Sequence, residues 1–395
     1  MKEQEVKNMY QQLINDNLIS GVSTTVIKNN QIVARMNAGF RLIDGGNRLP
    51  MTNDTYLRVA SISKFFTALG VMKLYENQKI SLDYDISDYL GFRVRNPYFD
   101  NIVITTRMLL SHTSSINDNN GYLISHENTI EEFLSDKSFN QEPYKKPGQY
   151  FTYSNLNYLL LGAIIENRAQ KRFDLFIKEL FEPMKLNFSF NILDFKHQIK
   201  RLGVLYDIRN NHFVASKDNY YTEKMEANIN LDTYRLGVNP GFFGPQGNLR
   251  ISSNELAEVM LMLMNNGIYQ GKEIISQSSL DMMFKSHWQF NKTLNNGELY
   301  NNFILSYGLG TQQITNTLYY DQLSSKKELY YIGHHGDAYG LISMFFFDWK
   351  KKEGFVNLVN GVGFDLSDKN NVSDISSLSK VEQKIIDIIG ENYLI

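Results

Sequence analysis

The chain has 395 residues, of which 43% are hydrophobic and 13% aromatic, so it can bury a sizeable core and disorder is not its default state. Its 40 basic and 42 acidic side chains give a formal net charge of -2, which argues against a surface for nucleic acid or an anionic membrane. Because it has no cysteine, disulfides, thiolate metal sites and cysteine nucleophiles are excluded.

The N-terminal third begins with charged and apolar residues in alternation, which predicts an amphipathic helix rather than a signal peptide. The stretch 21–40 alternates β-branched and polar residues around Asn29 and Asn30, which predicts a two-stranded hairpin. From Ser61 to Gln78 the apolar residues recur at helical spacing on most sides, so we expect a buried helix against the sheet.

The middle and last parts of the chain differ in pattern. Region 80–228 is mainly helical segments and polar loops, with a strong apolar helix at 155–167. Strand-like runs return at 329–332, 340–347 and 354–359, and Ser379 with Glu382 forms a capping box that predicts a last helix. We therefore expect an α/β (α+β) fold in which 1–79 and 229–395 form an antiparallel sheet flanked by helices and 80–228 is an inserted, mostly helical domain.

The apolar runs are far shorter than the 18 or more residues that span a bilayer, so no transmembrane segment is expected. Since the chain as given shows no export signal, we expect a cytoplasmic protein, or an extracytoplasmic one if a signal or anchor was removed.

Ser61 and Lys64 lie one helical turn apart, so the amine can approach the hydroxyl and serve as its base if burial lowers the lysine pKa. Ser-x-x-Lys occurs three times, also at Ser324 and Ser377, but only Ser61 opens a buried apolar helix. There, backbone N–H groups and the helix dipole can also stabilise an oxyanion. The alternative is that Ser61 only caps the helix.

The ordered segments TYLRVASISKFFTALGVMKLYENQKISLD, ITTRMLLSHTSSI, PGQYFTYSNLNYLLLGAIIE, NPGFFGPQGNLRISSNELAEVMLML, YGLG and GHHGDAYG extend over most of residues 20–360. Together they resemble the class C β-lactamase and penicillin-binding-protein-like family of serine hydrolases, which includes related esterases and D-amino-acid peptidases. The resemblance implies a β-lactamase/transpeptidase-like fold and a catalytic Ser61 and Lys64. It implies no metal or organic cofactor.

Tyr153-Ser154-Asn155 matches the second family motif, Tyr-x-Asn, although the bare pattern also occurs at 75–77 and 300–302. The resemblance makes Tyr153 catalytic and Asn155 a substrate-binding amide. A phenol near ammonium groups has a depressed pKa and can shuttle a proton. Otherwise Tyr153 is a core tyrosine with a satisfied hydroxyl.

The third motif resembles His334-His335-Gly336, where the family has Lys-Thr-Gly or His-x-Gly. The resemblance assigns His334 and Gly336 to substrate binding and the backbone N–H groups of Ser61 and Asp337 to the oxyanion. A metal site at the paired histidines is the alternative, but strand neighbours point to opposite faces and no third ligand is placed.

Two departures from the family bear on substrate. Histidine at position 334 is mostly neutral at pH 7, so we expect weak carboxylate recognition, which favours esters, amides or D-amino-acid peptides over efficient β-lactam hydrolysis. The family's Thr-Ser-Gly is replaced by Thr113-Ser114-Ser115, so the family pattern does not predict the conformation of the local turn. Phe242 and Phe243 either line the acyl pocket or pack in the core.

We therefore expect a serine hydrolase that forms an acyl-enzyme on an ester or amide, as a carboxylesterase, D,D-peptidase or β-lactamase-like enzyme. Its substrate is expected to be a small molecule or short peptide, and its oligomeric state is open. The alternative is a catalytically silent penicillin-binding or sensor protein that is acylated without turnover. A nucleophile-elbow hydrolase is disfavoured because the chain has no Gly-x-Ser-x-Gly.

Overall fold

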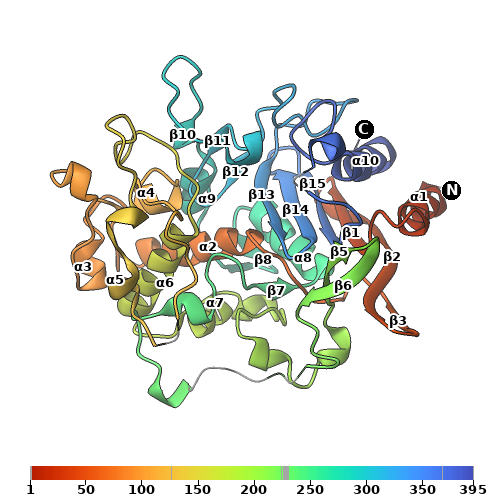
Figure 1. The fold of residues 1–395 in the computed structure, drawn as a ribbon, viewed down its shortest axis with the longest axis horizontal. Coiled ribbons are helices and arrows are strands. Elements are labelled where there is room, and N and C mark those ends of the chain that lie inside the picture. Colours follow the sequence, from red (N-terminus) through yellow and green to blue (C-terminus); the bar gives the residue numbers. More distant parts are fainter. Residues whose placement is uncertain (1, 126, 224, 226–230, 367, 395) are drawn as a thin grey trace.

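A nine-stranded antiparallel sheet is formed by segments from both ends of the chain. In the computed structural model, which describes residues 2–125, 127–223, 225, 231–366 and 368–394, the strand order is β10-β11-β12-β13-β14-β15-β1-β2-β3. The first strand, β1 (Gly21–Lys28), pairs with both β2 (Gln31–Asp44) and β15 (Glu353–Val359). The chain therefore ends on the sheet with which it began, as the sequence predicts, and both termini lie on the same side of the molecule (Figure 1).

The described residues contain these helices and strands. The α-helices are α1 (Lys2–Asn15), α2 (Ile62–Glu76), α3 (Ser87–Leu90), α4 (Thr106–Leu110), α5 (Ile130–Phe133), α6 (Asn155–Ala169), α7 (Phe173–Leu180), α8 (Ser253–Met264), α9 (Gln277–Phe284) and α10 (Lys380–Ile389). The other strands are β3 (Asn47–Pro50), β4 (Leu57–Arg58), β5 (Leu205–Arg209), β6 (His212–Lys217), β7 (Arg250–Ile251), β8 (Ile268–Tyr269), β9 (Lys272–Glu273), β10 (Trp288–Gln289), β11 (Ser306–Tyr307), β12 (Gln312–Gln313), β13 (Ile332–Ala338) and β14 (Leu341–Asp348). Within these ranges, no helix is both long and apolar enough to cross a bilayer.

The central strands are buried on both faces because helices cover each side of the sheet. Alternate residues of β14 belong to two separate apolar clusters: Met344 packs with α1 and α10, and Phe345 packs with α2 and α8. This explains why β14 is a nearly continuous apolar run rather than an alternating one.

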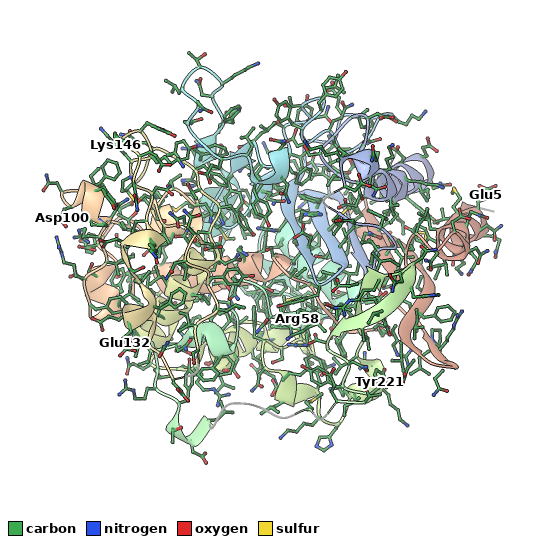
Figure 2. All side chains as sticks on the ribbon, viewed as in Figure 1. Glu5, Arg58, Asp100, Glu132, Lys146 and Tyr221 are labelled. Atoms are coloured by element: carbon green, nitrogen blue, oxygen red, sulfur yellow. The ribbon has the colours of Figure 1, made fainter. Side chains whose placement is uncertain are left out.

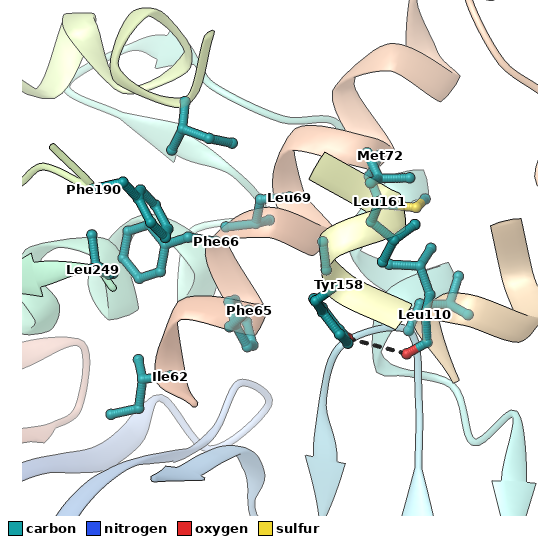
Figure 3. Packing of buried hydrophobic residues seen from close by; sticks show 14 of the residues in the cluster. Ile62, Phe65, Phe66, Leu69, Met72, Leu110, Tyr158, Leu161, Phe190 and Leu249 are labelled. Atoms are coloured by element: carbon teal, nitrogen blue, oxygen red, sulfur yellow. Dashed lines mark hydrogen bonds between the residues drawn. The ribbon is translucent and has the colours of Figure 1, made fainter. Parts of the chain in front are cut away.

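Helix α2 joins the sheet to the helical part of the molecule, and twelve of its residues are buried. Its apolar side chains pack against α6 in one continuous cluster (Figure 3). The only polar group of that cluster drawn with a hydrogen bond is Tyr158 of α6, whose hydroxyl donates to the Leu110 carbonyl over 3.3 Å. The start of α2 is thus held rigidly between the two parts of the molecule.

Two local predictions are confirmed. Asn29 and Asn30 both have positive φ (51° and 61°), as a two-residue hairpin turn between β1 and β2 requires. The capping box of Ser379 and Glu382 begins α10.

The strand predicted at 329–332 is wrong in position, because β13 begins at Ile332 and runs on to Ala338. Leu329 and Tyr331 are apolar because they pack into the cluster beneath α1 and α10, not because they form a strand. The strand contains two glycines, an aspartate and an alanine, which are depleted in strands, and it forms through pairing with β14.

Region 80–228 contains α3 to α7, but also the hairpin of β5 and β6, which the sequence did not suggest. This hairpin meets the sheet, since the Tyr206 amide donates to the Asn360 carbonyl over 2.9 Å. The division at 79/80 stays a prediction, and the boundary at 228/229 lies outside the described residues.

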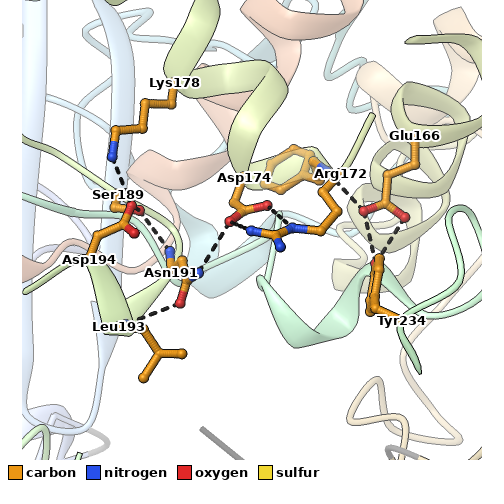
Figure 4. Close-up of polar contacts among 10 residues, drawn as sticks. Glu166, Arg172, Asp174, Lys178, Ser189, Asn191, Leu193, Asp194 and Tyr234 are labelled. Carbon is orange, nitrogen blue, oxygen red and sulfur yellow. Dashed lines mark hydrogen bonds and ion pairs between the residues drawn. The ribbon is translucent and has the colours of Figure 1, made fainter. Parts of the chain in front are cut away.

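The buried carboxylate of Glu166 connects α6 to the loop that contains Tyr234 and Gly237. Glu166 of α6 accepts hydrogen bonds from the Phe173 amide (2.9 Å), the Tyr234 hydroxyl (2.8 Å) and the Gly237 amide (2.7 Å). Figure 4 shows Glu166 and Tyr234 beside the Arg172–Asp174 ion pair. Burial raises the pKa of Glu166, against the lowering effect of these donors.

Glu166→Gln should therefore lower the free energy of unfolding by about 1–3 kcal/mol, because an amide cannot accept on both terminal atoms and one buried donor loses its partner. Urea denaturation followed by circular dichroism measures this change. The exposed Glu131→Gln on α5 is the matched control and should stay within about 0.5 kcal/mol of wild type. Equal stability of the two variants would contradict the assignment.

Candidate active site

Ser61 lies at the junction between β4 and α2. Ala60, just before it, has a left-handed backbone (φ 46°), which is costly for a residue with a Cβ. Ser61 is the N-cap of α2, but its side chain makes no capping hydrogen bond. Its Oγ instead lies 2.9 Å from Lys64 Nζ and 2.8 Å from the Tyr153 hydroxyl. The predicted pair is thus in contact, and Ser61 does not act as a simple helix cap.

Lys64 is fully buried and its amine is held by three groups. Besides Ser61, Nζ donates to Asn155 Oδ1 at 2.8 Å and to the Gln246 carbonyl at 2.9 Å. Burial lowers the pKa of Lys64 to about 7, although the carboxylates of Asp118 and Asp337 act in the opposite direction. Lys64 can therefore be a neutral base near physiological pH.

Tyr153 is held between two aromatic rings. Its ring stacks on His112 (4.4 Å between centroids, 28°) and on Tyr300 (4.3 Å, 30°). Burial, with a smaller contribution from Tyr300, raises the pKa of Tyr153 well above 10. The expectation that nearby ammonium groups depress this pKa is wrong, because loss of hydration dominates. Tyr153 is therefore a neutral phenol that can donate and pass on a proton.

Asp118 organises the second motif, and the sequence analysis did not identify it. Its carboxylate accepts from the Asn155 amide (2.8 Å), Asn155 Nδ2 (2.9 Å), Ser154 Oγ (2.7 Å) and the Leu156 amide (3.2 Å). These bonds cap the start of α6 and turn Asn155 Oδ1 toward Lys64. Only the position of Asp118 three residues after Ser115 in SHTSSIND could have drawn attention to it.

His112 stacks on the Tyr153 ring and also contacts the backbone beside it. Its Nδ1 accepts from the Ser154 backbone N–H over 3.1 Å, so the ring is neutral with its proton on Nε2. Burial and the positive charge of Lys64 lower the pKa of His112 well below 6.5, which agrees with that state. In the same motif, Ser115 has φ 67°, so the changed Thr-Ser-Ser turn keeps a left-handed residue without glycine.

The part of β13 that follows its short pairing with β12 passes beside Ser61. A Cβ added at Gly336 would lie 2.9 Å from the Ser61 amide nitrogen, so only glycine fits there. The His335 N–H points away from β14, to Gln312 Oε1 (2.8 Å). Because alternate N–H groups of a strand point to the same edge, the Asp337 N–H also points away from β14. This arrangement supports Ser61 and Asp337 as the two oxyanion donors.

His334, on β13, is fully buried. Its Nδ1 donates to the His335 carbonyl (2.5 Å) and its Nε2 accepts from the Tyr307 hydroxyl (2.9 Å). Burial and Lys64 lower the pKa of His334 to about 3, so it is neutral. Both ring nitrogens are thus engaged within the protein.

His335 points to the other face of β13, where Nε2 lies 2.8 Å from Glu382 at the start of α10. Hydrogen bonding and charge attraction from Glu382 raise the pKa of His335 against the effect of burial. In the described part of the chain, no group of three or more histidine, aspartate or glutamate side chains could hold a metal ion.

Two cavities meet at Ser61, and we call their union the cleft. They have volumes of about 450 and 520 Å³ and share Ser61, Tyr153, Tyr300 and Asp337. Phe242 and Phe243 both line the first cavity, and Phe243 is also packed in the core. The two alternatives for this pair, pocket lining and core packing, are therefore not exclusive. Tyr300 belongs to the Tyr-x-Asn pattern at 300–302, and nothing in that pattern predicts its position in the cleft.

The other two Ser-x-x-Lys patterns do not form pairs. Ser324 Oγ donates to Asp387 and Lys327 Nζ donates to the Leu394 carbonyl. Ser377 Oγ donates to the Asn302 carbonyl. Of the three patterns, only that of Ser61 joins its serine to its lysine.

The low pKa of Lys64 predicts the pH dependence of any hydrolysis. Below pH 7 the amine is protonated and cannot accept the serine proton, so kcat/KM for a neutral ester should fall about tenfold per pH unit. Above pH 7 it should level off. A profile that stays flat between pH 5 and pH 7 would contradict the base assignment.

The chain is similar to known proteins over most of its length. A family model described as Beta-lactamase matches residues 6–376. Protein flp of Staphylococcus aureus (strain N315) is 26% identical over 222 residues, which are 55% of this chain and 44% of that protein. Penicillin-binding protein 4* of Bacillus subtilis (strain 168) is 26% identical over 273 residues, 66% of this chain and 53% of that protein. The chain thus spans about half the length of these relatives.

Two solved structures share the fold. A D-amino acid amidase from Ochrobactrum anthropi SV3 superposes with a TM-score of 0.70 and 18% identity, covering 99% of this chain and 98% of its own. An octameric penicillin-binding protein homologue from Pyrococcus abyssi superposes with a TM-score of 0.69 and 21% identity, covering 100% of this chain and 77% of its own. These likenesses confirm the predicted fold class.

Proposed function

This chain belongs to the β-lactamase family, and we propose that it is a serine hydrolase that cleaves an ester or amide through an acyl-enzyme on Ser61. The observation that carries the proposal is the contact of Ser61 Oγ with both Lys64 Nζ (2.9 Å) and the Tyr153 hydroxyl (2.8 Å). A buried lysine whose pKa is lowered to about 7 is a suitable base for a serine hydroxyl.

Acylation uses these groups in order. Ser61 Oγ attacks the substrate carbonyl while its proton passes to Lys64, and the backbone N–H groups of Ser61 and Asp337 bind the oxyanion. The leaving group takes a proton from the Tyr153 hydroxyl, which recovers one from Lys64, and the bond to the carbonyl carbon breaks. The opposite shifts of the Lys64 and Tyr153 pKa values favour Lys64 as the base and Tyr153 as the proton carrier.

Deacylation reverses the roles. Water attacks the acyl carbon while Lys64 accepts its proton, and Lys64 then returns this proton to Ser61 Oγ, directly or through Tyr153, as the acyl bond breaks. Asn155 and Gly336 keep the substrate-binding roles that are predicted for them. Since both nitrogens of His334 are bonded inside the protein, we assign it to positioning Tyr307 rather than to direct contact with substrate.

The substrate class is tested by assaying a fluorescent penicillin, p-nitrophenyl esters of increasing length and D-amino-acid amides side by side. The solved D-amino acid amidase and penicillin-binding protein homologue support including both amides and β-lactams. We expect hydrolysis of at least one ester or amide, and weaker turnover of the anionic penicillin because His334 is neutral. Hydrolysis of none would contradict the proposal.

Intact-mass spectrometry of the same reactions separates the enzyme from the silent acylated protein. An enzyme releases product and shows at most a transient adduct. A stable adduct without released product would favour the silent protein.

A further inference from the structure

The carboxylate of Asp337 is placed in the cleft without a partner. Asp337 is the residue after Gly336, which touches Ser61, and it lines both cavities that meet at the nucleophile. Within the described part of the chain, this carboxylate accepts no hydrogen bond and forms no ion pair. A half-buried charge of this kind is costly unless a group from a ligand or water satisfies it.

Among the residues that the structure describes, no lysine or arginine forms an ion pair with Asp337. Lys64 contacts Ser61, and it must be neutral to act as the base. The second carboxylate at this end of the cleft, Asp118, adds further negative charge, and both carboxylates raise the pKa values of Lys64 and Tyr300.

The cations that line the first cavity are engaged or exposed. Arg58 and Arg250 both bond to Asp218, with distances of 2.7 and 2.8 Å, and Arg58 lies near the centre of the molecule (Figure 2). Lys217 is exposed and stacks over the ring of Tyr339. None of these three cations forms an ion pair with Asp337 in the described part of the chain.

A second polar residue of the first cavity has an acceptor without a partner. Gln246 lines the first cavity with Asp337 and is 9% exposed, and its Oε1 has no hydrogen-bond partner among the described residues. Its backbone carbonyl already holds Lys64 at 2.9 Å. Because Gln246 Oε1 is itself buried, Asp337 carries the unpartnered acceptor that is open to the cleft.

We propose that Asp337 makes this site selective for substrates that carry a cationic amine on the carbon next to the scissile carbonyl, as in an amino-acid amide. The inference rests on the proposed function. In the proposed mechanism the N–H of Asp337 binds the carbonyl oxygen. Asp337 also lines both cavities that meet at Ser61, so its carboxylate is available to an ammonium group on the carbon next to the carbonyl. A charge-assisted hydrogen bond to that ammonium corresponds to about 10- to 100-fold in affinity.

The test compares alanine p-nitroanilide, in both enantiomers, with isobutyryl p-nitroanilide, in which a methyl group replaces the ammonium. At pH 7 an ordinary α-amino group, with a pKa of about 7.7–8.0, is mostly protonated. The readout is the ratio of kcat/KM for the cationic substrate to that for the neutral one. Any general effect of a variant on the oxyanion donors or on Lys64 cancels in this ratio.

We expect Asp337→Asn to lower this ratio at least about tenfold, and Asp337→Glu to retain part of the preference. Asp88→Asn, which removes an exposed carboxylate of α3 outside the cleft lining, is the matched control and should leave the ratio unchanged. An unchanged ratio in Asp337→Asn, or an equal fall in Asp88→Asn, would overturn the inference.

A measurement on wild type covers the case in which the Asp337 variants do not fold. Alaninamide and isobutyramide are compared as competitive inhibitors of p-nitrophenyl acetate hydrolysis, and alaninamide should bind about tenfold more tightly. Equal inhibition would overturn the inference while Ser61-dependent hydrolysis still upheld the proposed function. Absence of any Ser61-dependent hydrolysis would instead overturn the proposed function.

Discussion

Replacing Ser61 with alanine should lower kcat/KM for p-nitrophenyl acetate by about 10⁴- to 10⁶-fold and remove covalent labelling. The hydroxyl is the only atom of the site that can form the acyl bond while being held by both Lys64 and Tyr153. The residual rate should come from the oxyanion donors and from binding alone.

Ser63→Ala is the matched control for Ser61→Ala. Ser63 lies on the same helix, but its hydroxyl accepts from the Leu249 amide over 3.0 Å and does not face the cleft. This variant should keep the label and most of the activity. If Ser61→Ala retained more than about one hundredth of the wild-type rate, the nucleophile would have to lie elsewhere.

Lys64→Met should lower kcat/KM by about 10²- to 10⁴-fold, the usual contribution of a positioned general base. Methionine has a similar length but cannot accept a proton. The remaining activity should also lose the fall below pH 7, because the group that titrates there is gone. Hydrolysis of p-nitrophenyl acetate measured from pH 5 to pH 9 tests both expectations.

The control for Lys64→Met is Lys79→Met, which removes an exposed lysine just beyond the end of α2. It should leave the rate and the pH profile unchanged. A Lys64→Met variant that keeps the wild-type profile with only a lower rate would assign the titration to another group.

The parts of the site that are local in sequence could be predicted. A serine and a lysine one turn apart on a buried helix must face the same way, so Ser61 and Lys64 followed from spacing and apolar pattern. Tyr153 and His334 lie far from them in sequence, and only the family resemblance connected them to the pair.

The groups that hold the site together depend on contacts between distant segments. Asp118, His112 and Tyr300 are ordinary residues in loops or turns, and nothing in their neighbours signals that they surround Tyr153. The predicted lowering of the Tyr153 pKa is wrong for the same reason, since burial is a property of the folded molecule.

The position of β13 illustrates a related limit for the fold. Strand preference read from apolar residues placed the strand at 329–332, whereas pairing with β14 places it at Ile332–Ala338. The residues that form the edge of the cleft, Gly336 and Asp337, are poor strand formers that are held by their partner strand. Gly336 allows the strand to approach Ser61 closely, and the N–H of Asp337 is the proposed oxyanion donor.

The most direct test of Ser61 as the activated nucleophile is to map the site of covalent modification by an alkyl fluorophosphonate. After tryptic digestion, the adduct should lie on the peptide from Val59 to Lys64, and fragmentation should place it on Ser61 rather than on Ser63. The rate of labelling should fall sharply in Lys64→Met. An adduct on any other residue, or equal labelling of wild type and Lys64→Met, would contradict the account.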